Sequence, residues 1–212
     1  MRLGRRRPPV LAEVSGEAPD GEGPGALRRG DMEAYGGLLE RLDGARTVLL
    51  TGEGEALRSA AVGLATTATA AGRRTVLVEC DLAHPRLAEA LGLAAVPGVA
   101  EYVRGEADAQ ALLKPLVLAG PGSAAAAGPL VCVVAGRPAS DAPELTSSGR
   151  LGEALQQLGA AYELTVVVGP TLRFQYSLTA LLSHADATIA CLEWAERRRK
   201  LPVPVTGLLL RG

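Results

Sequence analysis

The sequence predicts an α/β fold: a mostly parallel β-sheet with helices on both faces. Short apolar, β-branched runs alternate along the chain with longer segments of helical periodicity. These runs are apolar throughout, which is typical of strands buried on both faces of a parallel sheet. Because 48% of the residues are hydrophobic but only 3% are aromatic, the core must be built from Ala, Val and Leu.

Composition restricts the possible classes of protein. The formal net charge of −1 argues against nucleic-acid binding driven by overall charge. No apolar run approaches the ~18 residues of a membrane span, and residues 1–9 lack the apolar stretch of a signal peptide, so we expect a cytoplasmic protein. Cys80, Cys132 and Cys191 lie in or beside apolar runs, and we expect buried, reduced thiols rather than a metal site.

The chain divides into a short arm and one domain. Residues 1–30 begin with several arginines and continue as a Gly-, Glu- and Pro-rich stretch with little to bury, so we expect a disordered basic arm. Residues 31–212 carry the alternating pattern. An amphipathic helix is expected at 31–42, where Asp31 is a suitable N-cap.

The remaining elements follow from hydrophobic runs and breakers. We expect strands at residues 47–51, 75–79, 130–135, 164–168, 187–192 and 205–210. We expect helices at 57–71, 84–91, a short one ending at 102, 107–118, within 141–158, and at 178–183. Ligands of such sheets lie at the carboxyl ends of the strands, where Gly52, Asp81 and Gly169 should converge.

The first strand leads into a damaged phosphate-binding motif. A working P-loop reads G-x-x-x-x-G-K-[ST], in which glycines admit the phosphates, the lysine contacts them and the hydroxyl binds Mg²⁺. Gly52 to Ser59 has the right span, but Leu57 replaces the second glycine and Arg58 replaces the lysine. Arginine is a poor substitute because its planar guanidinium is bulkier than an ammonium group.

Several segments in order resemble one family. Residues 54–65, GEALRSAAVGLA, resemble GEGKSTVAANLA, and residues 79–87, ECDLAHPRL, resemble the second nucleotide motif DADLRRPRL. Residues 33–35, EAY, resemble the start of EAYRTLR, and residues 207–211, GLLLR, resemble GVVLN. Over residues 31–212 the chain resembles the cytoplasmic domain of bacterial tyrosine kinases of the capsule and exopolysaccharide type. They belong to the MinD/ParA-like P-loop ATPases, and the resemblance implies their three-layer sandwich.

The resemblance also implies the site residues. Positions that would contact a nucleotide are Gly52, Gly54, Arg58, Ser59 and Arg211. In an active protein, Glu79 and Asp81 would be the catalytic carboxylates, and Ser59 and Asp81 would hold the Mg²⁺ of Mg-ATP. An alignment by the following helix instead places Leu57 at the lysine position. Val168 stands where the family's third-motif aspartate lies, so Mg²⁺ would lose a supporting group.

These departures favour a pseudoenzyme. Phosphoryl transfer depends on positioning and charge stabilisation, and the lysine and one aspartate are both missing. The preferred hypothesis is a regulatory or scaffold partner, and the sequence leaves open whether it still binds ATP and Mg²⁺. Its partner would be an intact kinase homologue or a membrane polysaccharide chain-length regulator, which would hold it at the inner face of the membrane; a homo-oligomer is a further option. The alternatives are a weakly active ATPase or tyrosine autokinase, and a MinD/ParA-like positioning ATPase.

Some residues have simpler interpretations. Asp81 is as well suited to capping the helix expected near His84 and Pro85 as to binding a ligand. Residues 197–200, RRRK, are typical of a solvated face and, alternatively, of a contact with a partner or acidic lipid. Trp194 is expected to pack against the short C-terminal connection.

Overall fold

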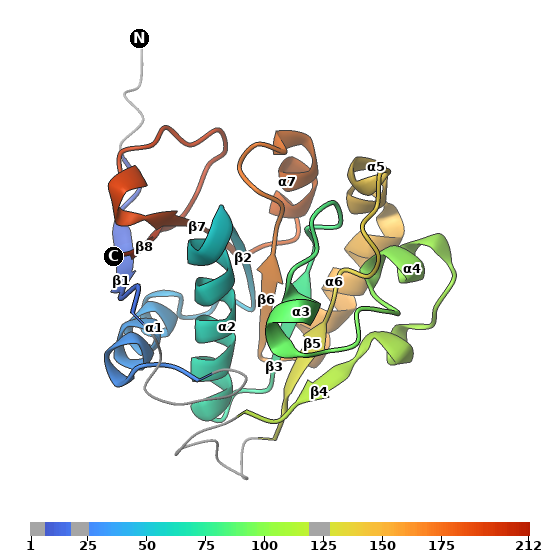
Figure 1. Ribbon diagram of the computed structural model, residues 1–212, viewed down its shortest axis with the longest axis horizontal. Coiled ribbons are helices and arrows are strands. Elements are labelled where there is room, and N and C mark those ends of the chain that lie inside the picture. The colour runs from blue at the N-terminus through green and yellow to red at the C-terminus, as the bar shows by residue number, and fades with distance from the viewer. Residues whose placement is uncertain (1–6, 18–25, 119–127) are drawn as a thin grey trace.

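The computed structural model describes residues 7–17, 26–118 and 128–212, and its centre is an eight-stranded sheet in the order β1-β8-β7-β2-β6-β3-β5-β4 (Figure 1). Neighbouring strands are parallel except β4 and β5, which are antiparallel. The strands are β1 (Val10–Val14), β2 (Thr47–Gly52), β3 (Thr75–Glu79), β4 (Lys114–Leu116), β5 (Leu130–Val133), β6 (Leu164–Val168), β7 (Ala187–Glu193) and β8 (Gly207–Arg211). The predicted α/β class with a mostly parallel sheet is confirmed.

Helices cover both faces of the sheet. They are α1 (Arg29–Arg41), α2 (Gly54–Ala70), α3 (Leu87–Leu91), α4 (Val99–Arg104), α5 (Ala142–Thr146), α6 (Gly149–Ala161) and α7 (Gln175–Leu182), with 3₁₀ turns η1 (Ala109–Leu112) and η2 (Trp194–Glu196). Successive side chains of β2 point to opposite faces. Val48 and Leu50 pack with the core side chains of α1 and α2, whereas Leu49 packs with those of α6 and α7. The result is three layers.

The central strands explain why the sequence selects this sheet. Every residue of β2, β3 and β6 is buried, as expected for strands covered on both faces. All three cysteines are buried and carry free thiols, as predicted. Burial raises the pKa of Cys80 and of Cys132 to about 12, so both thiols stay protonated at neutral pH.

The expected disordered arm is wrong for residues 10–14. They form β1, which pairs in parallel with β8 at the edge of the sheet. The Arg41 side chain donates a hydrogen bond to the Leu11 carbonyl, and the Asp31 carboxylate accepts the Ser15 N–H at 2.7 Å. The edge of β8 offers backbone partners that only the tertiary fold supplies. The rest of the predicted arm, residues 1–6 and 18–25, lies outside the described residues.

The predicted helix at 107–118 is also wrong. A single 3₁₀ turn, η1, is followed by β4 at the edge of the sheet. Pro115 lacks the N–H that a helix needs and is tolerated on an edge strand. Within the described ranges, no helix is both long and apolar enough to cross a membrane.

Candidate functional site

A cavity of about 580 Å³ lies at the carboxyl ends of β2, β3 and β6, where the sequence placed the site. Four of the seven predicted site residues line it: Gly54, Arg58, Glu79 and Asp81. Val168, which replaces the third-motif aspartate, forms part of the same wall. Topology therefore brings together the residues that the motifs predicted, but their individual environments differ from those expected.

The connection between β2 and α2 is one residue long. β2 ends at Gly52 and α2 begins at Gly54, so only Glu53 lies between them. The predicted helix start at residue 57 is therefore three residues late. Good helix formers occupy the intervening positions, namely Glu55, Ala56 and Leu57. The first turn of α2 therefore stands where the second half of a P-loop would lie.

The two glycines of the motif have different surroundings. A Cβ at Gly52 would lie 2.1 Å from the Cys191 carbonyl oxygen of β7, so this glycine permits close strand packing. Gly54 has φ of +60° with open space around it, and a glycine adopts this left-handed conformation without strain. Gly52 therefore allows β2 to pack closely against β7, and of the two glycines only Gly54 lines the cavity.

A carboxylate stands at the start of α2. The Glu53 Oε1 atom accepts a hydrogen bond from Arg199 Nη2 at 2.9 Å and one from Arg173 Nε at 3.4 Å. The hydrogen bond from Arg199 is the main cause of a lowered Glu53 pKa. The N-terminus of a helix attracts anions because its first N–H groups have no helical partners. Here the nearest anion belongs to the chain itself.

Sequence reasoning did not identify this ion-pair cluster. Glu53 occupies a variable position of the motif, and 146 residues separate it from Arg199. The basic run at 197–200 was noticed, but its partner depends on β7 lying beside β2 in the sheet. That neighbour relationship is a tertiary fact that no local pattern encodes.

Arg58, Ser59 and Arg211 line a second cavity of about 520 Å³. Arg58, which borders both cavities, forms an ion pair with Glu55 one turn away on α2. The Ser59 hydroxyl donates to the Ala56 carbonyl at 3.5 Å. Arg211 donates to Glu193 Oε1 at 3.1 Å. The structure therefore does not bring Ser59 and Arg211 together with Asp81, although the resemblance assigned them to one site.

Glu79 is bound to the backbone. Its Oε1 atom accepts the N–H groups of Arg86 at 2.6 Å and Leu87 at 2.8 Å, and its Oε2 atom accepts that of Ala135 at 3.2 Å. The residue is 2% exposed. Burial raises the pKa of the Glu79 carboxyl above its usual value, against the opposing effect of these hydrogen bonds. Glu79 thereby ties the start of α3 to the segment after β5.

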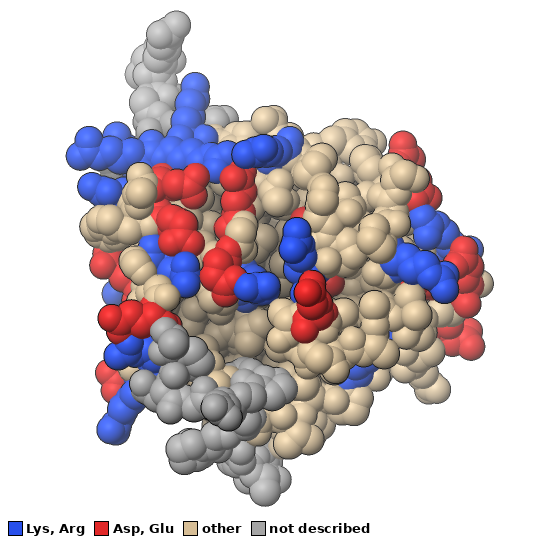
Figure 2. Space-filling view, in the orientation of Figure 1, with Lys and Arg blue, Asp and Glu red and all other residues tan. Residues whose placement is uncertain are grey.

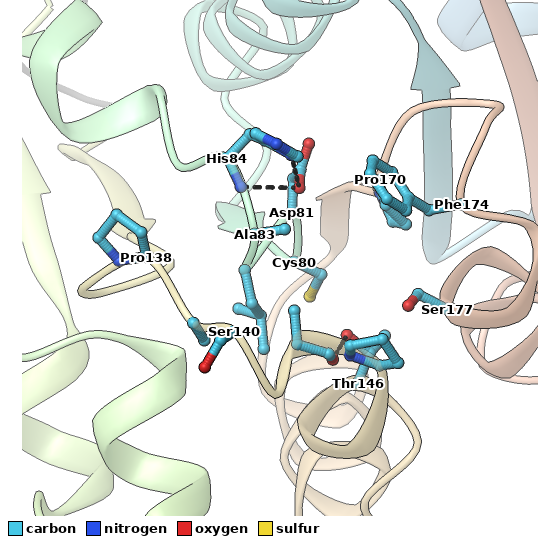
Figure 3. A pocket seen from close by; sticks show the side chains of 14 residues that line it. Cys80, Asp81, Ala83, His84, Pro138, Ser140, Thr146, Pro170, Phe174 and Ser177 are labelled. Atoms are coloured by element: carbon cyan, nitrogen blue, oxygen red, sulfur yellow. Dashed lines mark hydrogen bonds and ion pairs between the residues drawn. The ribbon is translucent and has the colours of Figure 1, made fainter.

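Asp81 borders two cavities. Besides the first, it lines a cavity of about 510 Å³ that it shares with His84, Phe174 and Ser177 (Figure 3). Asp81 Oδ1 accepts the His84 N–H at 3.1 Å and lies 3.7 Å from His84 Nδ1. Asp81 therefore closes a turn before α3 rather than capping the helix, which begins at Leu87 with Arg86 at its N-cap. Burial raises the pKa of the Asp81 carboxyl.

These residues do not fit a nucleoside triphosphate with Mg²⁺. The space at the start of α2 is bordered by the Glu53 carboxylate, and the two guanidinium groups nearest to it, Arg173 and Arg199, are bound to that carboxylate rather than free for a phosphate. The hydroxyl expected on Mg²⁺, that of Ser59, lines another cavity than Asp81. Arg58 is held by Glu55 at the position where a lysine would contact phosphate.

Comparisons with known proteins agree with the fold. No protein-family model and no curated protein matches the sequence. The kinase domain of Escherichia coli tyrosine kinase ETK is similar in structure, with 13% identity, 96% of this chain and 89% of that chain covered, and a TM-score of 0.72. The BceF tyrosine kinase domain has 20% identity, coverage of 85% and 77%, and a TM-score of 0.66.

A septum site-determining protein belongs to the same group of folds. MinD from Pyrococcus horikoshii, complexed with Mg-ADP, has 15% identity, coverage of 70% of this chain and 58% of that chain, and a TM-score of 0.51. The predicted resemblance is thus confirmed at the level of fold. The chain has the α/β P-loop fold of bacterial tyrosine kinase domains and MinD.

Proposed function

We propose that this chain is a degenerate P-loop protein, a pseudoenzyme that acts as a regulatory or scaffold partner rather than transferring phosphate. The observation that carries the proposal is the one-residue connection at Glu53, whose carboxylate is bound by Arg173 and Arg199. A phosphate-binding loop needs several backbone N–H groups free around an anion. In this chain most of the residues aligned with that loop, from Gly54 to Ser59, belong to α2.

The positions of the two retained carboxylates support the same proposal. Glu79 has three backbone donors and is 2% exposed, which leaves it little capacity to act as a general base. Both carboxylates line the cavity, but only Asp81 keeps the aspartate of the family motif. A single carboxylate without a lysine or a third-motif aspartate lacks the charge stabilisation on which phosphoryl transfer depends.

The proposed partner follows from the resemblance. A protein that keeps the fold of a tyrosine kinase domain without its phosphate loop is suited to bind what such domains bind. We therefore propose association with an intact kinase or a membrane chain-length regulator, in exopolysaccharide or capsule biosynthesis. In this account the fold supplies a surface, and the cavity at the carboxyl ends of the strands is bordered by internal ion pairs.

The experiment compares the wild-type chain with Asp81→Asn for Mg-ATP hydrolysis and for autophosphorylation. We expect both proteins to release phosphate at the rate of buffer alone. A wild-type rate above that of Asp81→Asn would contradict the proposal and support the weak ATPase or autokinase. A second arm adds either protein to an intact kinase of this fold; a scaffold should change that kinase's rate equally with and without the substitution.

A further inference from the structure

An exposed basic and aromatic surface lies at the same end of the sheet and adjoins the cavities through Arg173 and Phe174. The chain holds one Trp and one Phe, and both are exposed large hydrophobics: Trp194 is 43% exposed and Phe174 41% exposed. Tyr176, at 70%, is exposed beside Phe174. Aromatic side chains are costly to leave in water, so their concentration here indicates a contact surface.

Cations surround these aromatic side chains. We name as the basic aromatic rim the set Arg173, Tyr176, Trp194, Arg197, Arg198 and Lys200. Glu53 joins its two segments, because Arg173 and Arg199 both donate to the Glu53 carboxylate. Figure 2 shows Lys and Arg side chains gathered along the upper edge of the molecule, over η2 and the segment that follows it.

Two of these cations, Arg198 and Lys200, do not contribute ion pairs or side-chain hydrogen bonds to the described part of the fold. Both side chains are exposed. Arg197 lies over the Trp194 ring, with the guanidinium carbon 4.8 Å from the ring centroid. The pair combines a flat apolar surface with a positive charge.

We propose that the basic aromatic rim docks directly on the surface of an anionic lipid bilayer. Clusters of Lys and Arg are attracted to anionic headgroups, and Trp and Tyr are the residues that favour the membrane–water interface. Arg7 is exposed close to the start of the chain, next to Arg2, Arg5 and Arg6 in the sequence. These arginines would add to the attraction.

The shape of the rim favours a planar partner over a nucleic-acid strand. Tyr176, Trp194 and Arg198 line none of the three cavities described above. Single-stranded nucleic acid is bound in grooves that follow its backbone, whereas a bilayer contacts protruding side chains. The contact is independent of nucleotide and needs no membrane-spanning helix.

The test uses the fluorescence of Trp194, the chain's one tryptophan, with cosedimentation. Vesicles of pure phosphatidylcholine are compared with vesicles that contain about a third phosphatidylglycerol. We expect a blue shift of the emission and sedimentation with the anionic vesicles, and neither effect with neutral vesicles. Raising the salt to about 1 M should release the protein, because the screening length falls to roughly 3 Å.

Two double variants with the same change in net charge distinguish binding through the rim from a general effect of charge. Arg198→Glu with Lys200→Glu reverses two rim cations, and Arg73→Glu with Arg74→Glu reverses two cations at the amino ends of the strands. Each cation at an anionic surface contributes roughly a factor of five in affinity, so the rim variant should bind at least about 25-fold more weakly. The control should bind within about threefold of wild type, and thermal melting verifies that both variants fold.

Three outcomes would overturn the proposal. One is the absence of both a blue shift and sedimentation with anionic vesicles. Another is an equal loss of binding in the two double variants, which would show a general charge effect. The third is tighter binding of a single-stranded oligonucleotide that displaces the protein from vesicles, which would assign the rim to nucleic acid.

Discussion

Glu53 and Arg199 form a hydrogen-bonded ion pair, 2.9 Å between Oε1 and Nη2, across the carboxyl end of the sheet. The pair joins the start of α2 to the segment after η2, and Arg173 completes it from the loop before α7. It ties the residue before α2 to two arginines, and the Glu53 side chain makes no capping hydrogen bond to the helix. We regard this relationship as the structural reason for the loss of nucleotide binding that we propose.

The pair should stabilise the fold modestly. A double-mutant cycle of Glu53→Gln and Arg199→Gln should give a coupling of about 0.5–1 kcal/mol in urea unfolding at pH 7, because the pair is partly exposed and screened by water. If the effects of the two single substitutions on the free energy of unfolding were additive within error, the ion pair would not stabilise the fold and the prediction would be wrong.

The same pair predicts a pH dependence. The folded pKa of Glu53 lies below its unfolded value, so its stabilisation is present above the unfolded pKa and is lost as the pH falls through the folded pKa. The stability difference between wild type and Glu53→Gln should therefore shrink on the acid side of about pH 4.5. Urea unfolding between pH 7 and pH 3 measures it; a difference that grows on acidification would be the opposite result.

Glu79 is predicted to be a structural residue. Glu79→Ala leaves three backbone N–H groups without their acceptor and should lower the free energy of unfolding by on the order of 3 kcal/mol or more. Glu79→Gln keeps an oxygen for Arg86 and Leu87 and should cost roughly half as much. Urea denaturation measures both, and equal small losses of less than 1 kcal/mol would show that the carboxylate is dispensable to the fold.

Asp81 should cost stability at neutral pH. Burial raises its folded pKa above the unfolded value, so the folded state binds more protons between the two values. Stability is therefore greatest below the unfolded pKa and decreases as the pH rises through the folded pKa. Asp81→Asn can still accept the His84 N–H, and it should be more stable than wild type at pH 7 but not at pH 3. A pH-independent difference in thermal melting would contradict this.

Alanine substitutions at Gly63 and Gly37 distinguish the effect of packing on stability from the effect of helix propensity. A Cβ at Gly63 would lie 2.2 Å from the ring of Tyr35, which is 1% exposed and donates to the Ser59 carbonyl. Gly63→Ala should therefore destabilise the protein by about 1–3 kcal/mol. Gly37→Ala on α1 meets nothing within 4 Å and should stabilise it by about 0.5–1 kcal/mol. Chemical denaturation should show opposite signs for the two substitutions.

The sequence predicted the central strands well because strands buried on both faces consist of short runs of apolar and β-branched residues, which are visible locally. Strands at 75–79 and 164–168 match β3 and β6 to the residue. It could not predict β1, because Val10–Val14 forms a strand only where the edge of β8 is available. Four of the predicted site residues line one cavity at the strand ends. The interpretation of that cavity depends on where α2 begins, and helix starts are poorly defined by propensity.

Side-chain partners were the least predictable feature. Asp81 accepts the His84 N–H three residues away, in a turn before α3, whereas the sequence suggested a cap of the helix itself. Glu79 binds Ala135 across 56 residues, and Glu53 binds Arg199 across 146 residues. Such contacts depend on strand order, so local motifs do not predict the partners of the residues that they assign to catalysis or phosphate binding.

Calorimetric titration of the purified chain with Mg-ATP and Mg-ADP tests the central claim most directly. The start of α2 carries the Glu53 carboxylate in place of a phosphate-binding loop, and we predict no heat beyond dilution at millimolar nucleotide. Micromolar binding that Arg58→Ala abolishes would contradict the account and restore the nucleotide site.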